Sequence, residues 1–287
     1  MSHVLDLRRE VTRIVASHFI PVTPTLLVRR ALPDAGLRGV GPWIFLDHFG
    51  PLRLSPDDRG TPVHAHAGIE TVTYLLEGGM RHRDAAGHAG EISRHGLQWM
   101  TAGRGVVHAE RPAVGPGDMA HGLRLWAKLP RARQLAAPAY QHFAAESLPA
   151  FRTGEALVRV VAGTLMGRRS PAPAQWPLVL AHVSFPGRGR AELEVPRDFE
   201  LAAYVAAGHA CFGEVEADVG KLLRYSPEGR SVELANDLEE PTDILLLGGA
   251  RFAEPMLYQG GFVMDSAAAL HRAEQDYRAG RMGTLAG

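Results

Sequence analysis

The sequence has a single cysteine, Cys211, among its 287 residues. An intramolecular disulfide is therefore excluded, and so is a zinc or iron–sulfur site held by several cysteines. Long apolar runs are missing too: the most apolar short stretch, residues 244–247, falls far below the ~20 residues that cross a bilayer. The first 20 residues lack the apolar core of a signal peptide. We predict a cytoplasmic protein with no membrane partner.

An excess of charge of either sign is also missing. The sequence has 31 basic and 31 acidic residues, and neither sign forms a long run. A surface that binds nucleic acid usually carries a large basic patch, so direct binding to nucleic acid is not expected. Phosphate-loop motifs and the serine-nucleophile motifs GxSxG and SxxK do not occur in the sequence.

Short apolar segments bounded by glycine or proline recur along the chain, roughly every ten to fifteen residues, as in a β-sandwich or β-barrel. A helical pattern is clear only in the tail from Ser266 to Arg281, where Gly280 marks the expected end. Prolines interrupt the region between residues 130 and 150. We therefore predict an all-β protein with two similar domains, residues 1–135 and residues 136–287, the second including the helical tail.

Two pairs of candidate metal ligands bracket residues 62–112. His64 and His66 are separated by one residue, and so are His108 and Glu110. Side chains two residues apart lie on one face of a strand, so each pair can point the same way. Alternating apolar residues and glycine turns lie between the pairs and would fold the two ends together. The pattern predicts a small barrel with a metal in its mouth.

The chemistry of these ligands suits a divalent transition metal such as iron, manganese, nickel, copper or zinc, because calcium and magnesium prefer oxygen ligands alone. Four ligands leave two positions of an octahedron open for water, dioxygen or a substrate. A lone HxH pair is more often an ordinary surface or core feature, but the second pair after GRG favours a metal. No HxH pair follows residue 150, so we predict one metal per chain.

Other residues near the predicted site have alternative roles. His48 either orients a ligand by a hydrogen bond or is an ordinary buried histidine. Three histidines in a turn-rich hairpin are expected to be exposed to solvent rather than to support the metal: His82, His88 and His95. Four large apolar residues are expected to form barrel core rather than a cage for an aromatic substrate: Trp43, Phe45, Trp99 and Met100.

Several segments resemble the pirin family of the cupin superfamily. The resemblance covers most of the chain and is carried by RRALP (29–33), GPWIFLDHFGP (41–51), HAHAGIETVTYLLEG (64–78), HRDAAGHAG (82–90), QWMTAGRGVVHAE (98–110), LRLWAKLP (123–130), VRVVAG (158–163) and FVMD (262–265). It implies two stacked cupin barrels of the double-stranded β-helix, or jelly-roll, type. It also implies a metal, usually iron, in the N-terminal barrel alone.

The resemblance also implies which residues bind the metal. In pirins the ligands are the two histidines of HxH and both residues of HxE, which fall here on His64, His66, His108 and Glu110. Ordinary cupins place their carboxylate ligand at the position of Glu70, but the pirin pattern assigns this role to Glu110. The first motif usually reads HPHRGFE in pirins, so Ala67 replaces an arginine and the charge near the metal differs.

Two classes of function follow from the resemblance. Some pirins are quercetin 2,3-dioxygenases, in which a flavonol hydroxyl binds the metal, a carboxylate takes its proton and O2 cleaves the ring. Here Glu110 would be that catalytic base, with a small aromatic molecule as substrate, and a dioxygenase acting on an unrelated substrate fits the sequence equally well. Other pirins bind transcription factors or metabolic enzymes, so a metal- or redox-responsive regulator with a protein partner is the alternative.

Overall fold

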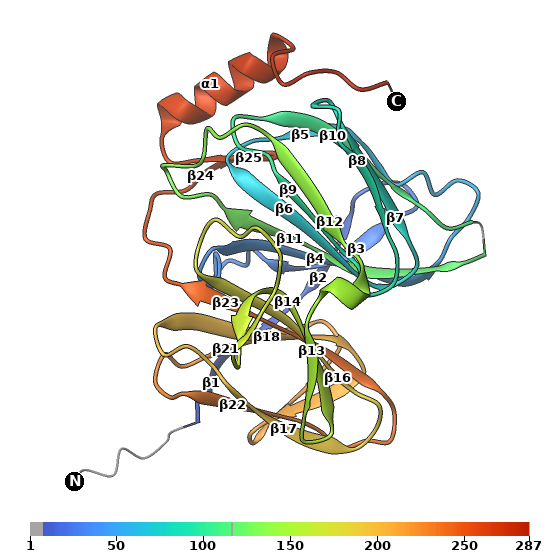
Figure 1. The fold of residues 1–287 in the computed structure, drawn as a ribbon, viewed down its shortest axis with the longest axis vertical. Coiled ribbons are helices and arrows are strands. Elements are labelled where there is room, and N and C mark those ends of the chain that lie inside the picture. The colour runs from blue at the N-terminus through green and yellow to red at the C-terminus, as the bar shows by residue number, and fades with distance from the viewer. Residues whose placement is uncertain (1–7, 116, 287) are drawn as a thin grey trace. The chain divides into compact units, whose positions relative to one another are not determined.

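The computed structural model describes residues 8–115 and 117–286, which form antiparallel β-sheets and one C-terminal helix (Figure 1). The chain divides into two compact units, and each unit is assembled from separate segments. Unit 1 contains residues 8–18, Ala31–Trp43 and Leu148–Arg251. Unit 2 contains Phe19–Arg30, Ile44–Ser147 and residues 252–286. The prediction of an all-β protein with a short C-terminal helix is confirmed.

Unit 2 holds the predicted metal-binding stretch on a large and a small antiparallel sheet. The larger sheet runs in the order β12 (Ala139–Phe143), β9 (Leu97–Thr101), β6 (Ile69–Glu77), β11 (Met119–Lys128), β4 (Trp43–Arg53), β3 (Leu27–Leu32) and β2 (His18–Pro21). The smaller sheet runs in the order β5 (Thr61–His66), β10 (Val106–Pro112), β7 (Met80–Asp84) and β8 (Ala89–Ile92). The 3₁₀ turn η1 (Ala145–Ser147) follows β12.

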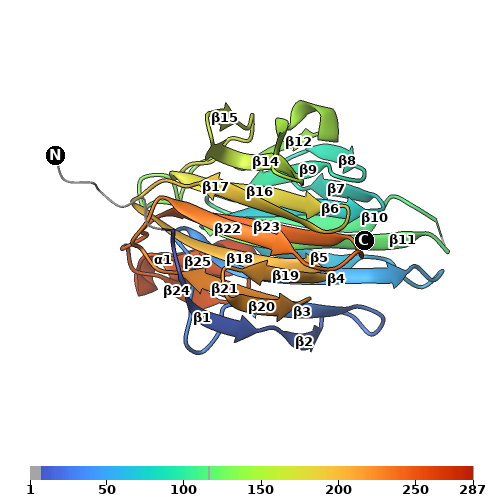
Figure 2. The same ribbon diagram turned by 90° about the horizontal axis from the view of Figure 1, so that it is seen from below.

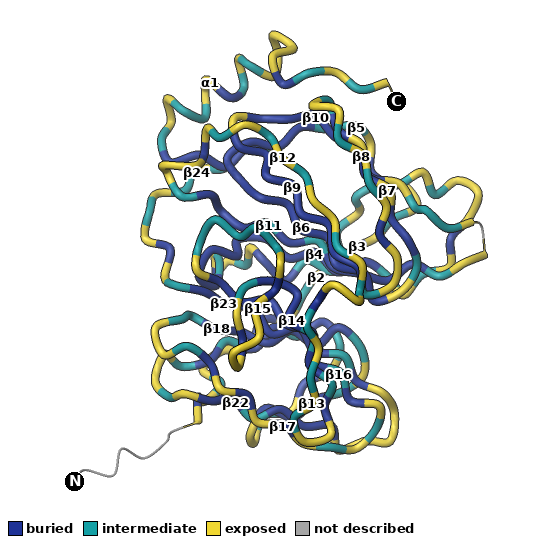
Figure 3. The backbone as a smooth tube through the Cα atoms, in the orientation of Figure 1, coloured by how far each residue is buried: buried dark blue, intermediate teal, exposed yellow. Residues whose placement is uncertain are grey.

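The core of unit 2 joins residues from both of its sheets. Ile69 of β6 and Met100 of β9 pack in one apolar cluster with Val106 of β10. Figure 3 shows that β6 and β9 are buried along most of their length. Burial of such side chains stabilises a fold by about 25 cal/mol for each Å² of apolar surface removed from water. The cluster therefore fixes β10, which carries two of the predicted ligands, relative to the larger sheet.

A glycine allows the chain to turn directly after the HxH strand. Gly68 has a φ of +75°, and a Cβ atom there would lie 2.1 Å from the carbonyl oxygen of Val263. Its backbone N–H donates to the carbonyl oxygen of Gly103 at 2.8 Å. Only glycine combines this left-handed conformation with so close an approach. The glycine of HAHAG is therefore required by the backbone.

The helical tail lies in unit 2, whereas the sequence prediction grouped it with the second domain. Helix α1 (Ala267–Arg278) begins after Ser266, whose side chain accepts a hydrogen bond from the backbone N–H of Ala269. The tail packs into an apolar cluster with residues of the HxH and HxE strands: Ala65, Val107, Phe262, Met264, Ala273 and Met282. In Figure 1 α1 follows β24 (Leu257–Gln259) and β25 (Phe262–Met264). Burial of this apolar face determines where the tail lies within unit 2.

Unit 1 also contains two antiparallel sheets. The larger one runs in the order β1 (Val11–Ala16), β21 (Lys221–Tyr225), β18 (Phe199–Ala207), β23 (Thr242–Ala250), β16 (Leu178–Phe185), β14 (Ala156–Leu165) and β13 (Ala150–Thr153), with β15 (Arg168–Arg169) paired to β14. The smaller one runs in the order β17 (Gly189–Glu194), β22 (Ser231–Asn236), β19 (His209–Phe212) and β20 (Val215–Asp218). Figure 2 shows β16 and β23 side by side.

Apolar side chains fill the interior of unit 1, among them Phe185, Leu193 and Leu246. Both groups of His, Asp and Glu side chains in the described residues that could hold a metal ion lie in unit 2. In residues 8–115 and 117–286, no helix is long and apolar enough to cross a membrane. The chemistry of the two units therefore differs although their strand arrangements are alike.

Lys128 is an unusual buried charge in unit 2. Its Nζ donates to the carbonyl oxygens of Gly68 and Leu129, both at 3.0 Å. Burial lowers the pKa of Lys128 from 10.5 to about 8, against the opposing effects of Asp265 and Glu254. Between these two pH values the unfolded chain keeps a proton that the folded chain has lost. The free energy of unfolding therefore rises with pH in this window.

Replacing Lys128 by methionine is expected to raise the free energy of unfolding at pH 7 by about 1 to 3 kcal/mol, because removal of the desolvated charge outweighs the loss of two hydrogen bonds to carbonyl oxygens. Urea titrations measure this change. The parent should also gain about 2 kcal/mol between pH 8 and pH 9.5 relative to the variant. Lys221→Met is the matched control. The prediction is contradicted if the difference in free energy of unfolding between the parent and Lys128→Met is the same at pH 8 and pH 9.5.

Candidate metal centre

Three histidine side chains converge in unit 2 from two paired strands. β5 carries His64 and His66, and β10 carries His108, which lies opposite His64 in the antiparallel register. The Nε2 atom of His64 is 3.0 Å from Nε2 of His66 and 3.1 Å from Nε2 of His108. The HxH spacing thus brings both rings of β5 to one site, as strand alternation predicts.

Backbone carbonyl groups hold two of these rings in the orientation that a metal ligand needs. Nδ1 of His64 donates to the carbonyl oxygen of Pro62 at 2.7 Å, and Nδ1 of His66 donates to that of Gly261 at 3.1 Å. A neutral imidazole has one proton, so both Nε2 atoms are left as acceptors. Two acceptor atoms 3.0 Å apart repel each other unless a cation binds both. The donor set therefore fits a divalent transition metal.

Burial keeps these imidazoles uncharged. It is the largest cause that lowers the pKa of His64, and it takes the pKa values of His66 and His108 well below the ordinary 6.5. The nearby guanidinium of Arg124 lowers the pKa of all three rings further. Neutral imidazole is the form that binds metals, so these residues need lose no proton to do so at neutral pH.

Glu110 lies in a second group of candidate ligands that shares His108 with the first. The ligand atoms of His64, His66 and His108 all lie within 4.8 Å of one another, and so do those of His82, His108 and Glu110. The four residues predicted from the sequence are therefore gathered around His108. The structure adds His82, which the sequence prediction had placed in solvent.

Three donors fix the Glu110 carboxylate. The Thr73 hydroxyl donates to Oε1 at 3.1 Å, Gln98 donates to the same oxygen, and Arg124 donates to Oε2. A carboxylate offers about four acceptor positions. Among the described residues Arg124 is the one donor to Oε2, so this oxygen can still accept a proton or bind a metal.

The sequence matches known proteins over nearly its whole length. The pirin family model matches residues 25–127, and that of the pirin C-terminal cupin domain matches residues 180–283. A pirin-like protein from Solanum lycopersicum is 31% identical over 286 residues, which cover 99% of this chain and 96% of the relative. This chain belongs to the pirin family. The resemblance seen in the sequence motifs is thereby confirmed.

Other relatives of this pirin include a bacterial protein and a solved structure. A pirin-like protein from Caulobacter vibrioides is 34% identical, and the match covers 91% of this pirin and 100% of that protein. The crystal structure of quercetin 2,3-dioxygenase from Acinetobacter baumannii has a TM-score of 0.89 and 27% identity, covering 98% of this pirin and 100% of that chain. A protein described as a quercetin 2,3-dioxygenase therefore shares the fold of this pirin.

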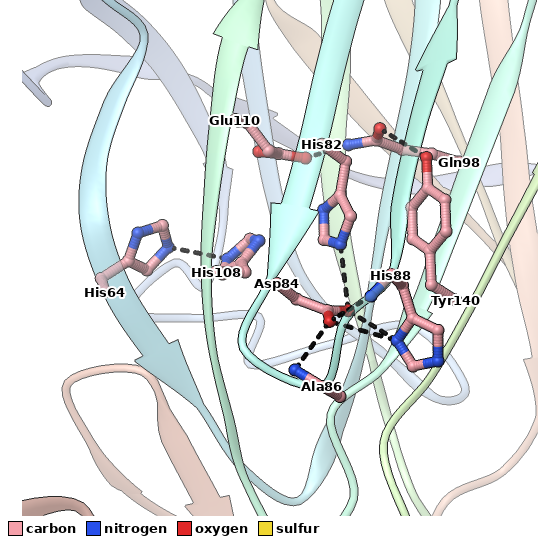
Figure 4. A network of polar contacts seen from close by, with 9 residues as sticks. All are labelled: His64, His82, Asp84, Ala86, His88, Gln98, His108, Glu110 and Tyr140. Atoms are coloured by element: carbon pink, nitrogen blue, oxygen red, sulfur yellow. Dashed lines mark hydrogen bonds and ion pairs between the residues drawn. The ribbon is translucent and has the colours of Figure 1, made fainter. Parts of the chain in front are cut away.

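His82 is the site residue that sequence reasoning missed in this pirin. It is buried, and its ring stacks on Tyr140 with centroids 4.1 Å apart. Nε2 of His82 lies 3.2 Å from a carboxylate oxygen of Asp84, which also accepts from Nδ1 of His88 at 2.9 Å (Figure 4). Met80, His82 and Asp84 alternate inward along β7, and this period of two was the available signal.

Asp84 is an anion that accepts a hydrogen bond from the His82 ring. Burial raises the pKa of Asp84, but hydrogen bonds from His82 and His88 lower it below the usual range. A carboxylate behind a histidine fixes the orientation of the ring, which is the arrangement that commonly supports metal ligands. His88 itself is only partly buried, so of the three hairpin histidines His82 is the one that the structure brings to the metal centre.

The remaining predicted neighbours have structural roles in this pirin. His48 pairs with His121, with their Nε2 atoms 2.7 Å apart, which agrees with the buried-histidine alternative. Glu70 accepts from Trp99 at 2.9 Å and from Thr101 at 3.0 Å, and it belongs to neither candidate ligand group of the described residues. The four large apolar residues expected in the core are all buried: Trp43, Phe45, Trp99 and Met100.

Proposed function

We propose that this chain binds one divalent transition metal, iron first among the candidates, through His64, His66 and His108, with Glu110 as a fourth ligand. The metal-loaded protein would be a dioxygenase that cleaves a flavonol-like aromatic. The observation that carries the proposal is that the Nε2 atoms of His64 and His66 lie 3.0 Å apart and are both unprotonated acceptors. Each ring carries its proton on Nδ1, which donates to a backbone carbonyl oxygen. The neighbouring quercetin 2,3-dioxygenase structure supports this reaction class.

The residues of the chain would divide the chemistry between them. A bound metal supplies Lewis acidity and a template for the substrate oxygen. Glu110 takes the proton of the substrate hydroxyl at Oε2, while Thr73 and Gln98 hold Oε1 and thereby the carboxylate plane. Tyr140 stays protonated as a hydrogen-bond donor, because burial and the charges of Glu110 and Asp84 raise its pKa.

Oxygen uptake tests the proposed activity. The iron-loaded chain should consume O2 with quercetin, whereas the metal-free chain should not. Glu110→Gln is expected to lower the turnover rate about 10²- to 10⁴-fold, the usual contribution of a positioned general base. Glu70→Gln is the matched control, because Glu70 is a buried carboxylate outside both candidate ligand groups among the described residues.

Metal analysis accompanies the assay, since a variant that has lost its metal says nothing about proton transfer. One metal ion per chain is expected in the parent and in Glu70→Gln. A fully loaded parent that consumes no more oxygen than the metal-free protein, with quercetin and close analogues, would reject the dioxygenase proposal.

A further inference from the structure

Arg124 and Trp126 lie beside the metal-facing histidines. They are two residues apart on β11, so they share one face of that strand. Arg124 donates to Oε2 of Glu110, and the Trp126 ring meets the His66 ring edge-on with centroids 4.9 Å apart. The two side chains thus place a guanidinium and an indole next to two of the candidate ligands.

Each of these side chains has a buried donor for which the described residues offer no acceptor. Nε of Arg124 and Nε1 of Trp126 are buried, and neither has a hydrogen-bond partner among the described residues. Buried donors are nearly always paired in native proteins, and an unpaired one usually marks the place of a water molecule or a ligand. Two such donors on one strand face indicate a ligand with acceptor oxygen atoms.

Trp126 is held as a flat apolar surface. Its ring stacks on Phe45, with centroids 4.1 Å apart and an angle of 10° between the planes. The other partner of Phe45 is the Arg30 guanidinium, 4.4 Å from its ring centroid, and Arg30 is fixed by two 2.7 Å hydrogen bonds to Asp47. A planar ligand could pack against this preorganised surface at little cost in side-chain entropy.

The charge balance of the site favours an anion. Arg124 neutralises Glu110, and imidazole binds a metal in its neutral form, so these five side chains would leave the charge of a bound divalent cation without compensation. Arg124 is the residue among them that is suited to planar oxygen anions, because guanidinium offers several N–H groups in one plane.

We infer that Arg124 and Trp126 form the recognition site for an anionic oxygen on an aromatic ligand of the metal centre. Arg124 binds the oxygen, Trp126 donates a second hydrogen bond, and the ring of the ligand packs near the Trp126–Phe45 stack. This inference rests on the proposed function and specifies its substrate class: a deprotonated hydroxyl or carboxylate on an aromatic ring. A neutral ether of the same shape would lack the contact with Arg124.

Anaerobic titration calorimetry of the metal-loaded protein tests the inference without turnover. The probes are 3-hydroxyflavone, its 3-methoxy ether, benzoate and benzamide. Arg124→Gln is expected to weaken binding of 3-hydroxyflavone and benzoate about 10- to 100-fold, as loss of a charge-assisted hydrogen bond does. Binding of the ether and of benzamide should change less than about twofold. Arg124→Lys should give an intermediate loss, since it keeps the charge without the planar group.

Arg111→Gln is the matched control, because Arg111 follows Glu110 on β10 but is exposed. Metal content and thermal unfolding of each variant separate a local effect from loss of the metal or of the fold. The inference is overturned if Arg124→Gln, fully loaded with metal, binds 3-hydroxyflavone and benzoate as the parent does. It is also overturned if the methoxy ether and benzamide lose as much affinity as 3-hydroxyflavone and benzoate.

The outcomes also separate this inference from the proposed function. Flavonol oxidation that is unaffected by Arg124→Gln, together with unchanged probe binding, would reject the inference and keep the dioxygenase. Benzoate binding that depends on Arg124, in a protein that oxidises no flavonol, would support the recognition site and reject the proposed reaction.

Discussion

Replacing His108 by alanine is expected to lower the metal affinity of the chain by more than about 100-fold. Loss of an outer hydrogen-bond partner alone typically lowers metal affinity about 10- to 100-fold, and His108 is a candidate for direct ligation. It is also the residue common to both groups of candidate ligands, so no three-residue group of the described residues survives its removal. Competition with a chelator of known affinity, followed by metal analysis, measures the change.

A second histidine substitution serves as the control for this experiment. His142 lies on β12 and is exposed, so His142→Ala should keep the parent affinity. Circular dichroism should show folded protein for both variants, because the β-sheet core does not depend on the His108 ring. If His108→Ala kept one tightly bound metal, the metal centre would lie elsewhere, and the proposed function would be rejected.

Acid stability should depend strongly on His48. Burial, together with the nearby charges of His121 and Arg29, lowers the pKa of His48 from 6.5 to about 3. As the pH falls below 6.5, the unfolded chain takes up a proton at this position that the folded chain does not accept until about pH 3. The free energy of unfolding therefore falls with decreasing pH, by about 3 kcal/mol between pH 6.5 and pH 4.5 from this residue alone.

His48→Gln removes the titrating ring and keeps a side chain that can hydrogen-bond to His121. Urea unfolding of the metal-free proteins at pH 7 and pH 4.5 gives the comparison. The variant should lose about 3 kcal/mol less than the parent over this range, because other groups contribute equally to both. His18→Gln, at an exposed position, should leave the pH dependence of the parent unchanged. Parallel pH profiles for His48→Gln and the parent would contradict the prediction.

The sequence predicted those features of the centre that depend on strand alternation. His64 and His66 come together because residues i and i+2 share a strand face, and His108 joins them through antiparallel pairing of β5 and β10. The choice of Glu110 over Glu70 agrees with the geometry, in which Glu110 adjoins His108 and Glu70 binds Trp99 and Thr101. The family pattern assigned this role to Glu110, and the spacing that places His108 and Glu110 on one strand face supported the assignment.

The sequence did not predict the features that depend on which strands pair with one another. His82 was interpreted as part of an exposed hairpin, but β7 pairs with β10 in a register that places His82 opposite Glu110. Arg124 lies in the LRLWAKLP segment, for which the sequence predicted no role at the metal, and only the folded structure brings it to Glu110. The sequence also did not show that the apolar face of the tail packs in one cluster with Val107.

The hydrogen bond between His66 and the carbonyl oxygen of Gly261 has a consequence for the order of events during synthesis. The ribosome makes the HxH motif almost 200 residues before it makes the group that sets the protonation of its second histidine. A nascent chain that ends anywhere before residue 261 lacks this constraint and the cover of the tail. The His66 ring can therefore be held in this orientation only after the chain has been made up to Gly261, and nonsense or frameshift changes far downstream would remove the constraint without touching a candidate ligand.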